Sequence, residues 1–315
     1  MRKLENILVV LDAQQEKQPA LTRAAFLSEA TGASLHLFMC AYDAAIGIAT
    51  FLSGGQKENF IKILVDGSEV LVSRLAQSYI DQGINVTYEV VWDRHPVEAI
   101  IAQCDKSDFD LVMKHARHHT RADAMFNHID WNLMRYSPCP VMLVKDGQWD
   151  EVGQVLAAVD AAPETELHKK LNEAVLDRAS FLANALNFEL HLVTAYPAPP
   201  VFAPVSVAVQ QQVNYRSKMR GMVEEHLATL ADQYGVIEER VHAVEGPVDW
   251  VVAQVSADLV AEFVVLGNVS RQGITGLSLG STAESTLDAL NTNVLMVRVT
   301  EDKTRPLKMA LDTTH

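Results

Sequence analysis

The chain has 315 residues, of which 49% are hydrophobic and 21% are charged. A chain of this length usually has two domains. Its composition is typical of a globular protein and excludes extensive disorder away from the ends. The formal net charge of -14 argues against direct binding of nucleic acid, because that binding depends on Lys and Arg to neutralise phosphates. The charge is compatible with one small anionic ligand that is held by backbone amides.

The three cysteines, Cys40, Cys104 and Cys139, are an odd number at unrelated spacings. This pattern favours reduced thiols in a cytosol over a disulfide framework. The N-terminal stretch MRKLENILVVLD lacks the apolar length of a signal peptide. No window approaches the roughly 20 apolar residues of a membrane span. We therefore expect a cytoplasmic protein without a membrane partner.

The first half opens with NILVVLDA (6–13), a short apolar run that ends in a polar residue and is typical of a buried strand. The elements that follow alternate between helix and strand. In chain order we expect a helix over 19–33, a strand over 34–43, a strand, a turn with proline and a helix over 86–104, a strand over 108–114 and a strand over 140–146.

The second half repeats this order, beginning with QVLAAVDA (154–161). Its matching elements are expected at 167–186, 189–197, 240–255, 261–267 and 293–299. Two copies of roughly 150 residues, each arranged β-α-β-α-β-α-β-α-β, fit the size of two ordinary domains. Continuous apolar strands that alternate with helices indicate a parallel sheet covered on both faces. The predicted fold class is α/β, with two tandem doubly wound domains that each have a five-stranded parallel sheet.

The domain boundaries follow from the repeat. We expect an N-terminal domain over 1–147, a C-terminal domain over 152–300 and a tail over 301–315. The final strand of each copy is apolar, and an apolar edge strand is a liability unless it is paired or covered. We therefore predict that the two final strands pair within the chain as a pseudo-dimer. The alternative is two independent domains on a linker, and association into a homodimer is also open.

The stretch LGNVSRQGITGLSLGSTAE (266–284) has four glycines and almost no negative charge. Open α/β sheets bind ligands beyond the carboxyl ends of their strands, where the strand order reverses. The second copy should line that crevice with this stretch, with Asp160, with the loop after Ala195 and with the turn at Gly246. Gly280 directly precedes the expected last helix, whose N-terminal amides suit a phosphate.

The spacing Gly267-x2-Ser270-x9-Gly280-Ser281 resembles the nucleotide-binding signature of the universal stress protein family, G-x2-G-x9-G-[S/T]. The resemblance covers nearly the whole chain as a tandem pair of such domains. The sequence departs from the signature at Ser270, where the family has glycine. A serine restricts the backbone there if the position needs a positive φ.

The resemblance implies that the second copy binds ATP or another adenine nucleotide, with or without Mg²⁺. By this resemblance Asp160 would meet the ribose hydroxyls or the adenine, and Ala195 would contact the base through its backbone. The positions implied for ribose and phosphates are Gly267, Ser270, Gly280, Ser281 and Thr282. An aspartate after a strand is more commonly a turn or N-cap residue, so the role of Asp160 depends on the rest of the crevice.

Two nucleotide motifs are absent from the sequence. It contains no G-x4-G-K-[S/T], and no G-x-G-x-x-G follows the first strand of either copy. An ATPase would need a general base and metal carboxylates close to the phosphates. Glu284 is the nearest candidate, and we interpret it as a first-turn carboxylate that favours the helix dipole. No catalytic residue is predicted.

The first copy has lost the glycines. Counted from the strand end, the residues that replace Gly267, Ser270, Gly280 and Ser281 are Lys114, Arg117, Asn127 and His128. We interpret this copy as degenerate for nucleotide binding, with a scaffold or regulatory role.

Four histidines of the same stretch, His115, His118, His119 and His128, raise a zinc hypothesis, since imidazoles at i, i+3 or i+4 can share the ion. We favour a solvated loop instead, because no cysteine or carboxylate has a ligand spacing. A local basic patch for an acidic partner is a further alternative.

Two segments, 44–55 and 197–213, are apolar without a strand pattern. We expect them to pack as loops on their own domain. The alternative is a lid over the crevice, or a groove for an acyl or aromatic group on a nucleotide-linked ligand.

The main functional hypothesis is a non-catalytic stress-response protein that binds an adenine nucleotide in its C-terminal domain, so that binding changes loop order or assembly. A weak ATP hydrolase or a transferase that uses the same crevice is the enzymatic alternative. A pure interaction scaffold with both sites empty is the third.

Overall fold

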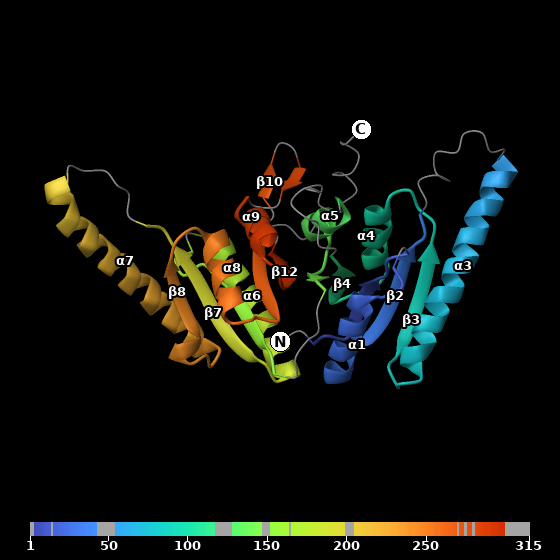
Figure 1. Cartoon of the computed structure of the whole chain (residues 1–315), viewed down its shortest axis with the longest axis horizontal. Coiled ribbons are helices and arrows are strands. Elements are labelled where there is room, and N and C mark those ends of the chain that lie inside the picture. The colour runs from blue at the N-terminus through green and yellow to red at the C-terminus, as the bar shows by residue number, and fades with distance from the viewer. Residues whose placement is uncertain are drawn as a thin grey trace. The chain divides into compact units, whose positions relative to one another are not determined.

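The structure is a computed structural model in which the chain divides into two compact units, Met1–Gly147 and Gln148–His315 (Figure 1). It describes residues 3–13, 15–42, 54–116, 128–146, 152–163, 165–198, 205–269, 271–273, 276–278 and 281–299.

The first unit alternates strands and helices along its whole length. Its elements are β1 (Asn6–Val10), α1 (Pro19–Thr31), β2 (Ser34–Cys40), α3 (Gly54–Ile80), β3 (Val86–Val91), α4 (Pro96–Lys106), β4 (Leu111–His115), α5 (His128–Tyr136) and β5 (Val141–Val144). The strands pair in the order β3-β2-β1-β4-β5, and every pairing is parallel.

The second unit repeats this plan and adds a short hairpin. Its elements are β6 (Gln154–Ala158), α6 (Glu166–Leu186), β7 (Glu189–Tyr196), α7 (Val205–Gln233), the 3-10 turn Glu238–Arg240, β8 (Val241–Glu245), α8 (Val248–Asp258), β9 (Phe263–Val269), β10 (Arg271–Gly273), β11 (Gly276–Ser278), α9 (Ser281–Ala289) and β12 (Asn293–Val299). The parallel strands run in the order β12-β9-β6-β7-β8, and β10 pairs antiparallel with β11.

The helices cover both faces of each sheet because the winding reverses. In the second unit β6, β7 and β8 proceed in one direction from the middle of the sheet, whereas β9 and β12 lie on the other side of β6. Right-handed crossovers then place the helices of the two directions on opposite faces. Accordingly α6 packs on β6, β9 and β12, while α8 and α9 pack on each other. The predicted fold class, a tandem pair of doubly wound α/β domains, is confirmed.

Buried aliphatic and aromatic side chains explain why the predicted strands form. Ile7, Leu8 and Val9 of β1 are fully buried, as are Val155 and Leu156 of β6. Strands that are covered on both faces need such continuous apolar runs. The core of each unit therefore lies between its parallel sheet and the two layers of helices.

The two apolar segments expected as loops are partly helical. Residues 54–55 belong to α3 and residues 205–213 belong to α7, so the loop prediction is wrong for those residues. Residues 44–53 and 199–204 lie outside the described ranges. Among the helices that the structure describes, none has the length and apolar character to cross a bilayer.

Candidate functional site

The reversal of winding in the second unit lies between β6 and β9, which are neighbours in the sheet. Parallel sheets of this kind bind ligands beyond the carboxyl ends of the two strands at such a point. Asp160 lies two residues after the end of β6, and Gly267 lies near the end of β9. The topology therefore brings these two predicted residues to one edge of one sheet.

The backbone of Asp160 is held by an amide side chain from the neighbouring helix. Asn172 of α6 accepts the backbone N–H of Asp160 through Oδ1 at 3.0 Å, and its Nδ2 donates to the Asp160 carbonyl oxygen at 2.6 Å. Asn172 is buried at 6% exposure. A buried amide must have its donors and acceptors paired, so this arrangement satisfies Asn172 and fixes Asp160 at once.

The side chain of Asp160 also stabilises the turn that follows β6. Its Oδ1 accepts the backbone N–H of Ala162 at 2.9 Å, which is the Asx turn that aspartate commonly makes after a strand. The intervening Ala161 N–H donates to Thr194 Oγ1 of β7 at 3.3 Å. Asp160 is exposed, so its carboxylate reaches solvent while it stabilises the turn.

Gly267 is required for packing inside the unit. It lies within β9, where it pairs with Val297 of β12, and β9 continues two residues beyond it to Val269. A Cβ atom at Gly267 would lie 2.6 Å from Leu171 Cγ of α6. Real Cβ contacts are longer than this, so a larger residue would force the Leu171 side chain or α6 to shift.

Asn268 follows Gly267 in the same strand. It is buried at 2% exposure, and among the described residues its Nδ2 has no hydrogen-bond partner. Because successive side chains of a strand point to opposite faces, Asn268 projects away from α6. A buried amide donor without a partner is uncommon in folded proteins.

Other predicted site residues lie on β7 and α9. Ala195 is half-buried and pairs with Val244 of β8. The last helix begins at Ser281, as expected. Thr282 is exposed, and its carbonyl oxygen accepts the hydroxyl of Thr286 at 2.7 Å.

The glycine-rich stretch is not one continuous loop. Its described part contains the end of β9, the antiparallel hairpin β10–β11 and the start of α9. Ser270 and Gly280 lie outside the described residues. The structure therefore places Asp160, Ala195 and Gly267 at the strand ends of the second unit and Ser281 at the start of α9.

The pairing of β1 with β4 and of β6 with β9 fixes which residues of the two units correspond. In this register Lys114 corresponds to Leu266, and His115 corresponds to Gly267. The prediction that Lys114 replaces Gly267 is therefore wrong by one residue. Matching the apolar runs by their ends caused the error, because β4 extends to His115 rather than ending at Lys114.

Both residues at the end of β4 are buried and paired. Lys114 Nζ forms an ion pair with Asp130 of α5 at 2.7 Å and donates to the His115 carbonyl oxygen at 3.0 Å. His115 Nε2 lies 3.0 Å from Asp146 Oδ1. The solvated-loop interpretation is therefore wrong for His115, which is 7% exposed and belongs to the sheet.

The zinc hypothesis gains no support from the described residues, where no three histidine, cysteine or carboxylate side chains group around a metal position. His118 and His119 lie outside the described ranges, as do Arg117 and Asn127. His128 begins α5, and its side chain is not described.

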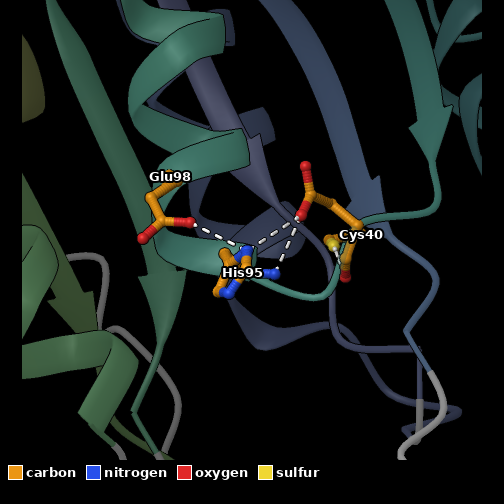
Figure 2. A network of polar contacts seen from close by, with 4 residues as sticks. Cys40, His95 and Glu98 are labelled. Atoms are coloured by element: carbon orange, nitrogen blue, oxygen red, sulfur yellow. Dashed lines mark hydrogen bonds and ion pairs between the residues drawn. The ribbon is translucent and has the colours of Figure 1, made fainter. Parts of the chain in front are cut away.

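A network of polar side chains occupies the carboxyl ends of β2 and β3 in the first unit (Figure 2). The thiol of Cys40 donates to the carbonyl oxygen of Asp93 at 3.5 Å. The Asp93 carboxylate accepts the backbone N–H of His95 at 2.9 Å, and the His95 imidazole lies 3.2 Å from Glu98. Burial raises the pKa of Cys40 to about 11, so this thiol stays protonated near neutral pH.

The second unit has smaller or uncharged residues at the corresponding places. By the pairing of β1 with β2 and of β6 with β7, Cys40 corresponds to Ala195. His95 and Pro247 are both the N-cap residues of the following helices. At these two places the first unit has a thiol and an imidazole where the second unit has a methyl group and a proline ring.

Sequence reasoning missed Asn172 and its counterpart in the first unit. Gln18, the N-cap residue of α1, accepts the N–H of Asp12 at 3.0 Å and donates to its carbonyl oxygen at 2.8 Å. The available signal was an amide residue in or beside the first helix of each copy, next to positions that face the sheet. That signal is weak, because most such amides are solvent-exposed.

Comparisons with known proteins agree with this architecture. The family model described as the universal stress protein family matches residues 3–145 and 153–298. Universal stress protein E of Escherichia coli K12 is 34% identical over 300 residues, which cover 95% of both chains. A universal stress protein E homolog of Haemophilus influenzae is 30% identical over 302 residues, which cover 94% of this chain and 98% of that protein.

Solved structures show the same fold. A protein of unknown function from Pseudomonas aeruginosa PAO1 superposes with a TM-score of 0.72 at 26% identity, covering 94% of this chain and 92% of that chain. A universal stress protein from Archaeoglobus fulgidus DSM 4304 superposes with a TM-score of 0.64 at 15% identity, covering 94% and 99%. With both halves matched by the family model, the chain belongs to the universal stress protein family.

Proposed function

We propose that this chain is a cytoplasmic, non-catalytic regulator of the stress response that binds an adenine nucleotide in its second unit. The observation that carries the proposal is the reversal of winding between β6 and β9, with Asp160 after one strand and a glycine-rich stretch after the other. Ligands of doubly wound sheets bind at this point. The first unit then acts as a scaffold or regulatory partner, because its corresponding stretch lacks the glycines of the signature.

The residues of the second unit fit a nucleotide in three respects. The exposed carboxylate of Asp160, whose backbone Asn172 fixes, is a hydrogen-bond acceptor for ribose hydroxyls. Ala195 leaves room for a base beside β7. The N-terminus of α9, from Ser281 to Thr282, presents first-turn backbone amides and the positive end of a helix dipole to phosphates.

The sequence motif assigns Ser270 and Gly280 to the binding of phosphates. Asn268 is a further candidate, as a buried hydrogen-bond donor to the ligand. The Nδ2 of Asn268 has no partner among the residues that the structure describes, and a polar ligand group would satisfy it. Gly267 supports the site indirectly, since its missing side chain lets α6 pack on β9 and so helps to position Asn172.

Isothermal titration calorimetry of the whole chain with ATP, ADP, AMP and a UDP-sugar, with and without Mg²⁺, tests the proposal. Asp160→Asn is the informative variant, because asparagine retains the Asx turn to Ala162 and removes only the charge. Asp12→Asn is the matched control in the first unit. We expect adenine nucleotides to bind and Asp160→Asn alone to weaken binding.

Two outcomes would contradict the proposal: no adenine nucleotide binds, or Asp12→Asn weakens binding while Asp160→Asn does not. A steady-state hydrolysis assay on the same samples addresses the enzymatic alternative. Turnover that is lost in Glu284→Gln, with nucleotide affinity unchanged, would favour a hydrolase over a regulator.

Assembly belongs to the same proposal. β5 and β12 are the last strands in the order of their own units, and an apolar strand at such a place needs a partner. We propose that these two strands pair within the chain and that two chains associate further. Sedimentation equilibrium with and without ATP would measure that association.

A further inference from the structure

The helix α3 of the first unit has an apolar stripe on its surface. Phe60, Ile63 and Val70 are 47%, 59% and 70% exposed, and together with Gly67 they follow the alternating spacing of three and four residues that a coiled-coil seam has. Single exposed apolar side chains are normal, but a contiguous row of them is typical of an interaction surface. Figure 1 shows α3 beside β3, with its N-terminal end reaching beyond the carboxyl ends of β2 and β3.

The stripe faces away from the sheet on which α3 packs. Val72 and Ala76 of α3 are buried at 0% and 1% exposure, on the side that contacts β2 and β3. Ile63 precedes Val72, and Gly67 precedes Ala76, by about two and a half turns of an α-helix. The members of each pair therefore lie on opposite sides of α3. The described part of the first unit leaves the stripe exposed.

Nothing that the structure describes in the first unit requires a glycine at position 67. Gly67 lies in the middle of α3, where glycine is the least favourable residue apart from proline. Its φ is not positive, and a Cβ atom at this place would meet no heavy atom within 4 Å. A missing side chain on an exposed helix face allows another chain to approach the backbone closely.

We propose that α3 is the surface through which two copies of this chain associate, as an antiparallel pair of helices about a twofold axis. In the register that is symmetric about position 65, Phe60 of one copy lies opposite Val70 of the other, and Ile63 lies opposite Gly67. Each Ile63 then fills the space at a Gly67, and every member of the stripe has an apolar or glycine partner. In a parallel pair the two Gly67 positions would face each other, and that space would stay empty.

Charged side chains beside the stripe fit the same register. Lys62 and Asp66 are exposed on one flank of the stripe, and the antiparallel pair brings Lys62 of each copy close to Asp66 of the other. In a parallel pair, each would lie level with its own like charge. Opposite charges on the flanks of a helix pair determine its orientation. One pair of helices buries less area than a standard interface of about 1,600 Å², so we expect a dissociation constant on the order of micromolar.

The inference rests on the association of two chains that is proposed above, and it adds the surface. It does not depend on nucleotide binding, because α3 belongs to the first unit and the predicted phosphate contacts belong to the second.

Sedimentation equilibrium of the whole chain without nucleotide, over a series of micromolar concentrations, tests the inference. We expect a monomer–dimer equilibrium. Val70→Glu should weaken it about tenfold or more, because the dimer would bury an unpaired charge in its seam. Met222→Glu is the matched control, since Met222 lies on α7 of the second unit and is 49% exposed. This control should leave the equilibrium unchanged.

Two further changes test the antiparallel register. Gly67→Leu should also weaken the dimer, because the new side chain occupies the space for Ile63. Asp66→Lys should weaken it, and Lys62→Asp/Asp66→Lys should restore it, because the charges are then exchanged as a pair. The changed residues are all exposed, so the monomer should keep its fold, which circular dichroism verifies.

The outcomes separate the surface from the association itself. A chain that stays monomeric at every concentration would contradict both. A dimer that Val70→Glu and Gly67→Leu leave intact would overturn the α3 surface alone. A dimer that the double charge exchange fails to restore would overturn the antiparallel arrangement.

Discussion

Asn172 holds Asp160 by both of its backbone groups, with contacts of 3.0 Å to the N–H and 2.6 Å to the carbonyl oxygen. Gln18 holds Asp12 in the same way in the first unit. The two amides have different side chains and come from different places, one inside α6 and the other at the N-cap of α1. The shared feature is the fixed backbone after the first strand of each unit.

Asn172→Ala is expected to leave two backbone groups of Asp160 without partners. Loss of such bonds lowers the free energy of unfolding by about 1–3 kcal/mol, and the looser turn weakens nucleotide binding in the second unit. Urea denaturation and calorimetry measure the two effects. Gln18→Ala is the matched control, with a similar loss of stability and unchanged affinity. Equal loss of affinity in both variants would argue against a site in the second unit.

Gly267→Ala is expected to destabilise the protein by about 1–3 kcal/mol, because the new methyl group overlaps Leu171. Combining it with Leu171→Ala should remove most of that penalty, since the overlapping atoms are gone. A double-mutant cycle by thermal or urea unfolding measures the coupling. If the two changes are simply additive, Gly267 is not a packing residue, and a direct role at the ligand would explain it better.

The sequence predicted most strands and their succession along the chain, because buried parallel strands are continuous apolar runs, as in NILVV and QVLAA. It matched Lys114 with Gly267, whereas the register of the strands matches His115 with Gly267. An apolar run does not mark the residue at which its strand ends. The early start of α7 at Val205 was hidden by the four prolines of the segment 197–213. Asn172 could not be predicted, because its partner is the backbone of Asp160, and a backbone group has no sequence signature.

Acid should destabilise the second unit through a pair of stacked histidines. His191 and His242 have ring centroids 5.4 Å apart and are joined by a hydrogen bond of 3.1 Å. Burial lowers the pKa of His191 to about 4 and also lowers the pKa of His242. In the unfolded chain both titrate near the ordinary value of about 6.5.

Between these values the unfolded chain binds protons that the folded chain does not. Stability is therefore complete above about pH 6.5 and decreases as the pH falls toward 4. Thermal unfolding across this range should show a falling midpoint. In the variant His191→Gln/His242→Gln the decrease should be shallower. A midpoint that rises on acidification would contradict the assignment.

Asp130→Asn should leave the buried Lys114 without its counter-ion. Breaking a buried pair from one side costs about 3–5 kcal/mol, whereas replacing both partners by apolar residues is often neutral. Urea denaturation of Asp130→Asn and of Lys114→Met/Asp130→Leu distinguishes the two. Glu166→Gln is a suitable control, because its pair with Lys169 is exposed and such pairs contribute only about 0–1 kcal/mol. A loss in Asp130→Asn no larger than that of this control would show that Lys114 is not desolvated.

The most direct test of nucleotide binding by the second unit is photo-crosslinking of the whole chain with an azido-adenine nucleotide, followed by peptide mapping. We expect labelled peptides from the second unit, around Asp160 and Ala195, and we expect excess ATP to abolish the label. Labelling confined to peptides of the first unit around Asp12 and Cys40, or labelling that ATP does not displace, would contradict the account.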